Sequence, residues 1–365
     1  MEFSATPLSA TSRRRAFVAV YSLSLVASSS AALAQEPIES NGWWSTPAVG
    51  LGPILLRSQS PLSLLRLTPT PLQPVTTPRG DAMVGAVVDW NNYFALDAEG
   101  RYLVDAESVG LTVGAAFGLT DRLDVHASLP IAYRGGGVLD GFVEGFESFI
   151  GRPNEDRYND PRDRYLVRIV RPDGTVVERH GSDAGWALED PAVGIRYQLH
   201  RGSARAPSVL LAGGLKLPFG NAEELHSSGG VDAYLALALG QRLGPRFHLY
   251  ASLAGMRYGE TEVAGIDLRR SQWSFFGGLE FRRSTRTSWL LQGVVTSAGT
   301  RSYGGFAEST FEVTLGIKHL LRPDLLLEVS VLENLFVFNN SPDVGFHFGV
   351  VKRLQLSREN DLGEQ

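Results

Sequence analysis

The stretch Val231–Tyr258, VDAYLALALGQRLGPRFHLYASLAGMRY, alternates apolar residues with small or polar ones along two arms. The first arm places five apolar residues on one side: Val231, Ala233, Leu235, Leu237 and Leu239. A period of two is typical of a β-strand with one apolar face. The arms meet at QRLGPR, where Gly244 and Pro245 favour a turn. The stretch therefore predicts a β-hairpin, and similar hairpins recur along most of the chain.

The N-terminus has the features of an export signal. Arg13, Arg14 and Arg15 precede the run AFVAVYSLSLVASSSAALAQ, in which Ala32 and Ala34 form an A-x-A cleavage site. A basic start, a short apolar run and small residues at its end predict a secretory signal peptide over residues 1–34. Its removal takes away three arginines and one glutamate, so the formal charge changes from −5 to −7.

Composition excludes several classes of protein. The 365 residues include no cysteine, so no disulfide framework is expected. The acidic exported chain has no basic cluster to neutralise phosphates, which argues against nucleic acid as a partner. No run after residue 34 reaches eighteen apolar residues, so no transmembrane helix is expected. A soluble β-protein and an outer-membrane barrel remain.

Alternating segments separated by turns favour the barrel. Twelve strands are predicted near 83–94, 107–119, 123–133, 186–199, 207–218, 229–241, 246–259, 270–283, 286–298, 307–319, 324–334 and 343–354. Short and longer connections alternate, as periplasmic turns and external loops do. We therefore predict an all-β fold, a transmembrane antiparallel up-and-down β-barrel over residues 81–355, in the bacterial outer membrane. Its expected partners are outer-membrane lipids, lipopolysaccharide and the barrel-assembly machinery. A polar tail, residues 356–365, follows.

Residues 35–80 have no strand period and contain eight prolines. Proline lacks the N–H that a sheet ladder requires, so an extended segment outside the sheet is expected. Two interpretations stay open: a disordered lead-in, or a partial plug folded into the barrel. The apolar residues of GPILLRSQSPL, at 52–62, argue against pure disorder.

A long external loop at 135–185 interrupts the strand pattern. It opens with Gly135, Gly136 and Gly137, and then four apolar residues recur at helical spacing: Leu139, Phe142, Phe146 and Phe149. Three acidic residues fall opposite them, namely Asp140, Glu144 and Glu147, so a short amphipathic helix is predicted. A hairpin around Pro172-Asp173-Gly174 follows. The loop either caps the barrel mouth, which we favour, or folds into the lumen as a gate built on the four apolar residues.

Several phrases resemble a bacterial family catalogued as domain of unknown function 3187. They are RSQSPLSLL at 57–65, YRGGGVLDGFVEGFESFIGRPN at 133–154, LKLPFG at 215–220 and SPDVGFHFGV at 341–350. The resemblance spans nearly the whole exported chain. It implies an outer-membrane barrel and assigns no catalytic or binding residue. One departure from usual outer-membrane barrels is that the last strand ends in Leu354 and a polar tail, QLSRENDLGEQ, instead of a terminal aromatic residue.

If the apolar residues face lipid, the alternate positions face the lumen and carry both signs of charge. The predicted inward residues are Asp124, His126, Asp190, Arg196, Lys216, Asp232, Glu280, Arg282, Glu312, Lys318, Glu328 and Arg353. Such a mixture suits a lumen filled by water or by paired side chains, and it indicates no preference for anions or cations.

One arrangement could serve catalysis. Asp124, His126 and Ser128 occupy alternate positions on one strand and share a face. In a hydrolase of this kind the serine acts as nucleophile and the histidine as base. His226 and Ser228 have the same spacing but fall in a loop. The strand trio would point into the lumen, away from a lipid substrate. No metal-ligand spacing and no phosphate loop occur, so no metal or other cofactor is expected.

Three functions remain, in decreasing order of support. The first is a passive channel or a transporter of small solutes or hydrophobic compounds. The second is a non-conducting structural or surface-interaction barrel whose loop 135–185 binds a partner. The third is an outer-membrane lipid hydrolase that uses the His-x-Ser pair.

Overall fold

The computed structural model describes residues 46, 48–149, 151, 155–334 and 340–356, all within the compact unit Ile38–Gln365. The predicted signal peptide, with its cleavage site after Ala34, lies outside the described residues. The same holds for residues 35–45 and for all but the first residue of the predicted tail.

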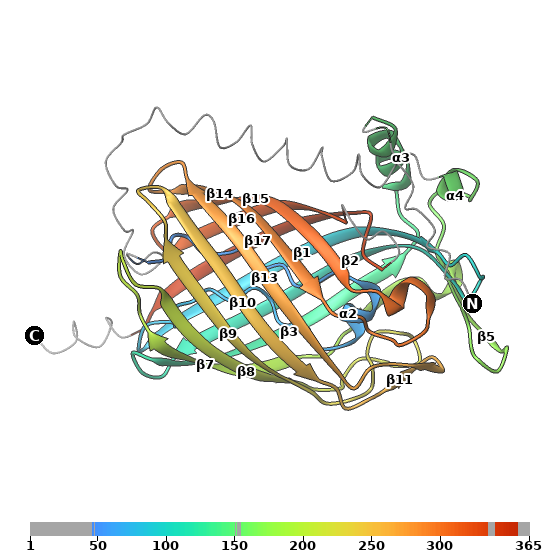
Figure 1. The fold of residues 1–365 in the computed structure, drawn as a ribbon, viewed down its shortest axis with the longest axis horizontal. Coiled ribbons are helices and arrows are strands. Elements are labelled where there is room, and N and C mark those ends of the chain that lie inside the picture. Colours follow the sequence, from blue (N-terminus) through green and yellow to red (C-terminus); the bar gives the residue numbers. More distant parts are fainter. Residues whose placement is uncertain (1–45, 47, 150, 152–154, 335–339, 357–365) are drawn as a thin grey trace, which may run out of the picture. The chain divides into compact units, whose positions relative to one another are not determined.

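One antiparallel sheet forms the body of the molecule (Figure 1). Its wall strands are β1 (Asp81–Leu96), β2 (Tyr102–Gly118), β3 (Leu123–Gly135), β6 (Gly185–Leu188), β7 (Ala192–His200), β8 (Ser208–Lys216), β9 (Asp232–Arg242), β10 (Phe247–Arg257), β13 (Ser271–Arg282), β14 (Thr287–Thr296), β15 (Thr310–Arg322), β16 (Leu325–Glu333) and β17 (Val344–Gln355). Both β6 and β7 pair with β3, so they act as two halves of one strand.

The sheet closes on itself. The last strand, β17, pairs with the first, β1, from Asp81 opposite Gln355 to Asn92 opposite Val344. With β6 and β7 counted together, the wall is a closed barrel of 12 strands in sequence order. The predicted fold class is confirmed. Closure leaves no unpaired edge in the wall, as a lipid environment requires.

The two ends of the barrel differ in their connections. At one end, called here the short-turn end, the strands are joined by residues 119–122, 201–207, 243–246, 283–286 and 323–324. At the other, the long-loop end, residues 136–184, 217–231, 258–270, 297–309 and 334–343 make most of the connections. In Figure 1 the short turns lie on the left and the long loops on the right.

The wall has an apolar outer face and a mostly polar inner one. On the hairpin β9–β10, Leu235 and Leu253 are 62% and 57% exposed, whereas Asp232 and Tyr250 are almost fully buried. Because successive side chains of a strand point to opposite faces, this contrast continues along each strand. In an outer-membrane barrel the exposed leucines contact lipid.

Two strand boundaries differ from prediction. The segment predicted as one strand at 186–199 breaks between Leu188 and Ala192, where Pro191 has no N–H to give to the ladder. The loop predicted at 95–105 is shorter, since β2 already begins at Tyr102. Its first residues, 102–105, pair with the hairpin strand β4 (Leu166–Val170) as well as with β1.

The long connection after β3 contains two helices and a hairpin. They are α3 (Asp140–Phe149), α4 (Glu155–Tyr158), β4, β5 (Val176–His180) and a 3-10 turn, η3 (Gly181–Asp183). A small hairpin, β11 (Glu262–Val263) with β12 (Ile266–Asp267), and a second 3-10 turn, η4 (Gly304–Ala307), belong to other long loops. Among the described helices, none has the length and apolar character needed to span a membrane.

The helix predicted around Leu139–Phe149 is present as α3, but its burial is the reverse of the usual amphipathic pattern. Phe142, Phe146 and Phe149 are exposed, whereas Asp140 and Glu144 are buried. Arg157 pairs with Asp140 at 2.8 Å and Arg162 pairs with Glu144, so the acidic face packs against the residues that follow it. The Phe142 ring lies 5.8 Å from Phe346 on the outer side of β17. In this structure the three phenylalanines therefore do not form a gate in the lumen; only Leu139 is buried.

The segment before β1 runs inside the barrel. Its ascending limb, residues 48–60, starts at the short-turn end, where a side chain at Gly202 would collide with Ala48. The short helix α2 (Pro61–Leu65) lies toward the long-loop end (Figure 1). The descending limb, residues 66–80, returns to the short-turn end, where Gly80 N–H donates to Gly118 O at 2.8 Å. The segment is thus a bent insert with both ends at the short-turn end.

Candidate functional site

Inner-face side chains bind the backbone of the ascending limb. Leu51 N–H donates to Glu280 at 2.9 Å, Ile54 N–H to Gln292 at 3.0 Å and Gln59 N–H to Glu312 at 2.8 Å. Lys318 Nζ donates in the other direction, to the carbonyl of Pro53 at 2.5 Å. These contacts tie the limb to β13, β14 and β15 along the length of the wall.

The descending limb is bound in the same way to the opposite strands. Leu67 N–H donates to Asp232 at 3.0 Å, and Thr77 N–H donates to Asp124 at 2.6 Å. Gln198 bonds the segment twice, since it accepts from Thr76 N–H at 3.0 Å and donates to Pro74 O at 3.1 Å. The insert therefore spans the lumen between two sides of the barrel.

This arrangement follows from the composition of the insert. Prolines prevent residues 48–80 from forming a strand ladder or a long helix, so their N–H and C=O groups need other partners once buried. A buried unpaired backbone group costs about 1–3 kcal/mol. The carboxylates and amides of the inner face supply those partners, which explains why so many polar side chains are buried in the lumen.

The structure places all twelve predicted inward residues on the inner side of the wall or at its ends. Ten are buried, while His126 and Arg353 are partly exposed. Several are brought together as ion pairs: Asp124 with Arg196, Lys216 with Asp190 and Asp232, and Lys318 with Glu328. Arg353 pairs with Asp81 beside the seam of the barrel, and Arg282 donates to Thr285 O at 2.9 Å. Glu280 and Glu312 accept instead from the insert.

The trio Asp124, His126 and Ser128 does not assemble as a catalytic triad. Asp124 is held by Arg196 Nε at 2.8 Å and by Thr77 N–H. His126 Nε2 lies 3.4 Å from the Tyr234 hydroxyl, and among the described residues no hydrogen bond joins it to Ser128. Ser228 accepts from Lys216 at 3.0 Å. The described residues also contain no group of three or more His, Cys, Asp or Glu arranged to hold a metal ion.

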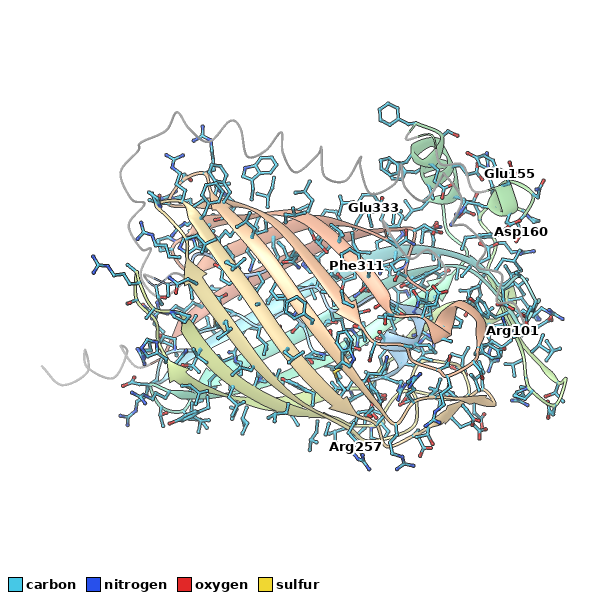
Figure 2. All side chains as sticks on the ribbon, in the orientation of Figure 1. Arg101, Glu155, Asp160, Arg257, Phe311 and Glu333 are labelled. Carbon is cyan, nitrogen blue, oxygen red and sulfur yellow. The ribbon has the colours of Figure 1, made fainter. Side chains whose placement is uncertain are left out.

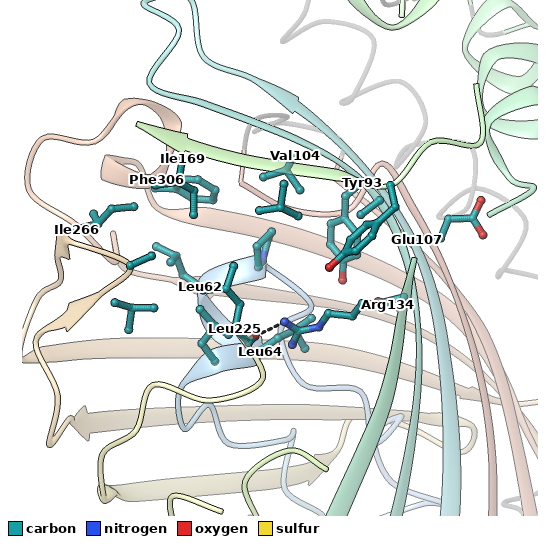
Figure 3. Close-up of a pocket in the computed structure, with 18 residues that line it drawn as sticks. Leu62, Leu64, Tyr93, Val104, Glu107, Arg134, Ile169, Leu225, Ile266 and Phe306 are labelled. Atoms are coloured by element: carbon teal, nitrogen blue, oxygen red, sulfur yellow. Dashed lines mark hydrogen bonds between the residues drawn. The ribbon is translucent and has the colours of Figure 1, made fainter. Parts of the chain in front are cut away.

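An apolar cavity of about 100 Å³ lies at the long-loop end (Figure 3). Its floor is the top of the insert, and its walls come from four separate loops and from the strands β1, β2 and β3. The apolar lining includes Leu62, Leu64, Leu65, Val104, Ala106, Val167, Ile169, Leu225, Val263, Ile266 and Phe306. Most of these residues form one buried cluster, so the loops fold over the insert as a lid with its own core.

The polar residues at the cavity are already engaged. Arg134 donates to Leu225 O, as the dashed line in Figure 3 shows, and to Glu189 at 2.9 Å. Glu107 accepts from Trp90 Nε1 at 2.9 Å, and the Tyr93 hydroxyl donates to Gln59 O at 3.0 Å. Burial raises the pKa of Tyr165, which keeps its phenol neutral. A molecule in the cavity would meet mainly hydrocarbon, so the site is suited to an apolar ligand.

One titratable group next to the cavity is strongly perturbed. Burial, with the nearby cations Arg134 and Arg179, lowers the pKa of His226 to about 4. The His226 N–H donates to Asn221 O at 2.9 Å, and the neighbouring Leu225 lines the cavity. This bond comes from the backbone N–H of His226, while its buried neutral imidazole packs inside the loop that forms one cavity wall.

Sequence reasoning missed most of this site. Gln198, Gln292 and Tyr250 occupy inward strand positions, and the alternation could have identified them as partners of the insert. Leu62, Leu64 and Leu65 were noticed only as apolar residues in a proline-rich segment. Leu225, Val263, Ile266 and Phe306 lie in different loops, and no local pattern indicates that they converge.

A closed antiparallel barrel with an apolar outer wall and a polar inner face is the architecture of bacterial outer-membrane channels. The chain belongs to the family described as "Protein of unknown function (DUF3187)", whose model matches residues 38–354. The resemblance found in the sequence is therefore confirmed. No curated protein matches the chain.

A solved outer-membrane channel shares this fold, and other solved structures show weaker likeness. The COG4313 outer membrane channel from Pseudomonas putida F1 has a TM-score of 0.53 and 10% identity, over 78% of this chain and 99% of that one. The NanC porin has a TM-score of 0.42 and 9% identity, over 75% and 100%. A Pseudomonas aeruginosa FadL homologue has a TM-score of 0.36 and 10% identity, over 83% and 99%. At such identities the likeness concerns the fold alone, which is that of a protein of the outer membrane.

Proposed function

We propose that the protein admits small apolar solutes through the outer membrane, with the apolar cavity as the first binding site. In this proposal the long-loop end faces the cell exterior and the short-turn end faces the periplasm. The observation that carries it is the position of the cavity: a hydrocarbon-lined space at the mouth of the barrel, floored by the insert that fills the lumen. The channel fold of the COG4313 protein is consistent with it.

The size of the cavity limits the ligand. A cavity of about 150 Å³ lined by Leu, Ile and Phe binds benzene. The present cavity is somewhat smaller, at about 100 Å³, and its lining is of the same kind. A small aromatic ring or a short alkyl chain fits this description, provided that the lid adjusts slightly. A charged solute would lose its hydration without gaining a polar partner, since the polar groups at the cavity are already bonded.

Passage beyond the cavity requires the insert to move. Leu62, Leu64 and Leu65 line the cavity and belong to the same segment that spans the lumen. A ligand that pushes on α2 therefore acts directly on the insert. The insert is held both by hydrogen bonds to its backbone and by apolar contacts such as those of Leu51 with Leu320. In this proposal a shift of the insert exchanges some of its hydrogen-bond partners for water while the wall stays folded.

A variant whose side chain fills the cavity tests the proposal. Ala106 lies on the inner side of β2 and lines the cavity, so Ala106→Phe should occupy the space. We expect fluorobenzene binding, followed by ¹⁹F NMR on the purified chain, to weaken at least about tenfold. Uptake of labelled toluene by cells that express the variant should fall to the level of cells without the protein.

Ala233→Phe provides the matched control, because it adds the same ring on the lipid side of β9. That variant should bind and take up the solute as the unmodified chain does. Unchanged binding and uptake in Ala106→Phe would show that the cavity does not serve transport.

The filled lumen also supports a second function, a barrel that does not conduct and acts through its external surface. The backbone bonds from Leu51 to Thr77 leave the insert fixed on two sides. Planar-bilayer recordings distinguish the two functions. A chain that inserts but stays silent both with and without a small aromatic solute would favour the non-conducting barrel.

A further inference from the structure

A second feature, independent of the cavity, occurs at the opposite end of the barrel. Three turns that follow one another around the wall each carry two arginines: Arg201 and Arg205, Arg242 and Arg246, Arg283 and Arg286. They connect β7 to β8, β9 to β10 and β13 to β14, and these six strands are consecutive neighbours in the sheet. We call these six residues the arginine patch.

The three turns themselves contain no acidic residue. The chain has no Asp or Glu between residues 191 and 222, 233 and 259, or 281 and 307, although it is acidic as a whole. In the described part of the chain, no carboxylate forms an ion pair with Arg201, Arg205, Arg242, Arg283 or Arg286. By contrast, Arg322 in the next turn is paired with Asp324 at 3.4 Å.

The depth of the patch in the membrane is set by aromatic residues beside it. Phe247, Phe281 and Trp289 are cross-strand neighbours on the outer face, and the rings of Phe247 and Phe281 lie 5.2 Å apart. Each is within three residues of an arginine of the patch. Aromatic rows of this kind lie at the boundary between acyl chains and headgroups. The arginines therefore extend into the headgroup layer itself.

We infer that the arginine patch binds the phosphate groups of anionic phospholipids in the leaflet at the short-turn end. A guanidinium presents parallel N–H donors that match phosphate oxygens, and several guanidiniums on adjacent turns can hold one diacidic headgroup or several singly charged ones. Basic clusters at a membrane surface are attracted to anionic lipid headgroups, and salt screens the attraction.

Three exposed arginines give a test that spares the turn structure. Arg242 donates to Gly244 O within its turn and is left unchanged. The variant Arg205→Gln/Arg283→Gln/Arg286→Gln removes three charges from three exposed positions. Binding of phosphatidylglycerol and of phosphatidylcholine to the full chain is measured by native mass spectrometry from neutral detergent. We expect the unmodified chain to prefer phosphatidylglycerol and the triple variant to bind it at least about tenfold more weakly.

The matched control removes three exposed arginines from the other end. Arg257, Arg270 and Arg301 lie at the long-loop end, and Figure 2 labels Arg257 there. Their replacement by glutamine changes the net charge equally and should leave phosphatidylglycerol binding within about twofold. The migration of each variant on gels, compared with and without heating, checks that both variants keep the folded barrel.

Three results would overturn the inference. They are an unchanged lipid preference in the first variant, an equal loss in the control variant, and displacement of the lipid by inorganic phosphate at the same phosphate concentration. The last result would mean that the arginines bind any phosphate and not a lipid headgroup.

Discussion

The short-turn end and the long-loop end of this barrel close the same wall by different physical means. At the short-turn end the connections are brief, the charges are mostly arginine, and the insert is held by buried polar contacts such as those of Glu280. At the long-loop end the loops pack an apolar cluster over α2 and leave a cavity. The insert is therefore anchored at the short-turn end, and the proposed ligand site lies at the long-loop end.

The largest expected effect compares two carboxylates that hold the ascending limb. Glu280, at the short-turn end, accepts from Leu51 N–H, Tyr250 and Ser288, whereas Glu312, at the long-loop end, accepts from Gln59 N–H. Glu280→Ala leaves several buried donors unpaired and should lower the free energy of unfolding by about 4 kcal/mol. Glu312→Ala also removes hydrogen bonds from Ser58 and from Ser60 N–H, and it should cost less, about 2 kcal/mol.

Urea unfolding in lipid vesicles, followed by tryptophan fluorescence, measures both values. Equal losses of stability in the two variants would contradict the inference that the insert is held more strongly at the short-turn end. Glu280→Gln serves as the control: it keeps an acceptor and should lose less than Glu280→Ala.

The next effect concerns acid and the loop 217–231 at the long-loop end. Burial lowers the pKa of His226 from its usual 6.5 to about 4, so the unfolded loop binds a proton more readily than the folded one. Loop stability is therefore complete above pH 6.5, declines as the pH falls, and stops declining below about pH 4. The full loss corresponds to about 3 kcal/mol.

Hydrogen exchange of residues 217–231 between pH 7 and pH 4, corrected for intrinsic rates, measures this opening. The variant His226→Gln should remove the response in the loop. An identical acid response in the variant would assign the effect to another group.

A smaller effect tests the reversed faces of α3. Asp140 accepts from Arg157, Asn92 and Asp163 N–H, so Asp140→Ala should cost about 2 kcal/mol. Phe149 is 87% exposed, and Phe149→Ser should change stability by less than about 0.5 kcal/mol. Thermal unfolding of Asp140→Ala and Phe149→Ser measures the two stability losses. A larger loss from Phe149→Ser would mean that the phenylalanines pack as a core.

The strands of the wall were predictable because the alternation that identifies a strand is local in the sequence. Alternation along Val231–Tyr258 identifies the strands, and the lengths of the connections indicate a barrel. The path of residues 48–80 was not predictable, since the segment has no period and its partners, such as Glu280 for Leu51, lie 229 positions away. The orientation of α3 depends on Arg157 and Arg162, which follow the helix and show no helical spacing with it. The cavity requires four loops to meet, and a single sequence does not report such convergence.

The course of the insert also has a consequence for assembly. It begins and ends at the short-turn end and is followed directly by β1, which pairs with the last strand. A bent segment of this kind enters a barrel as a doubled chain, so no chain end has to be threaded through the pore. The seam between β1 and β17 can therefore form before the segment is in place, and the segment can leave and return while the seam stays closed.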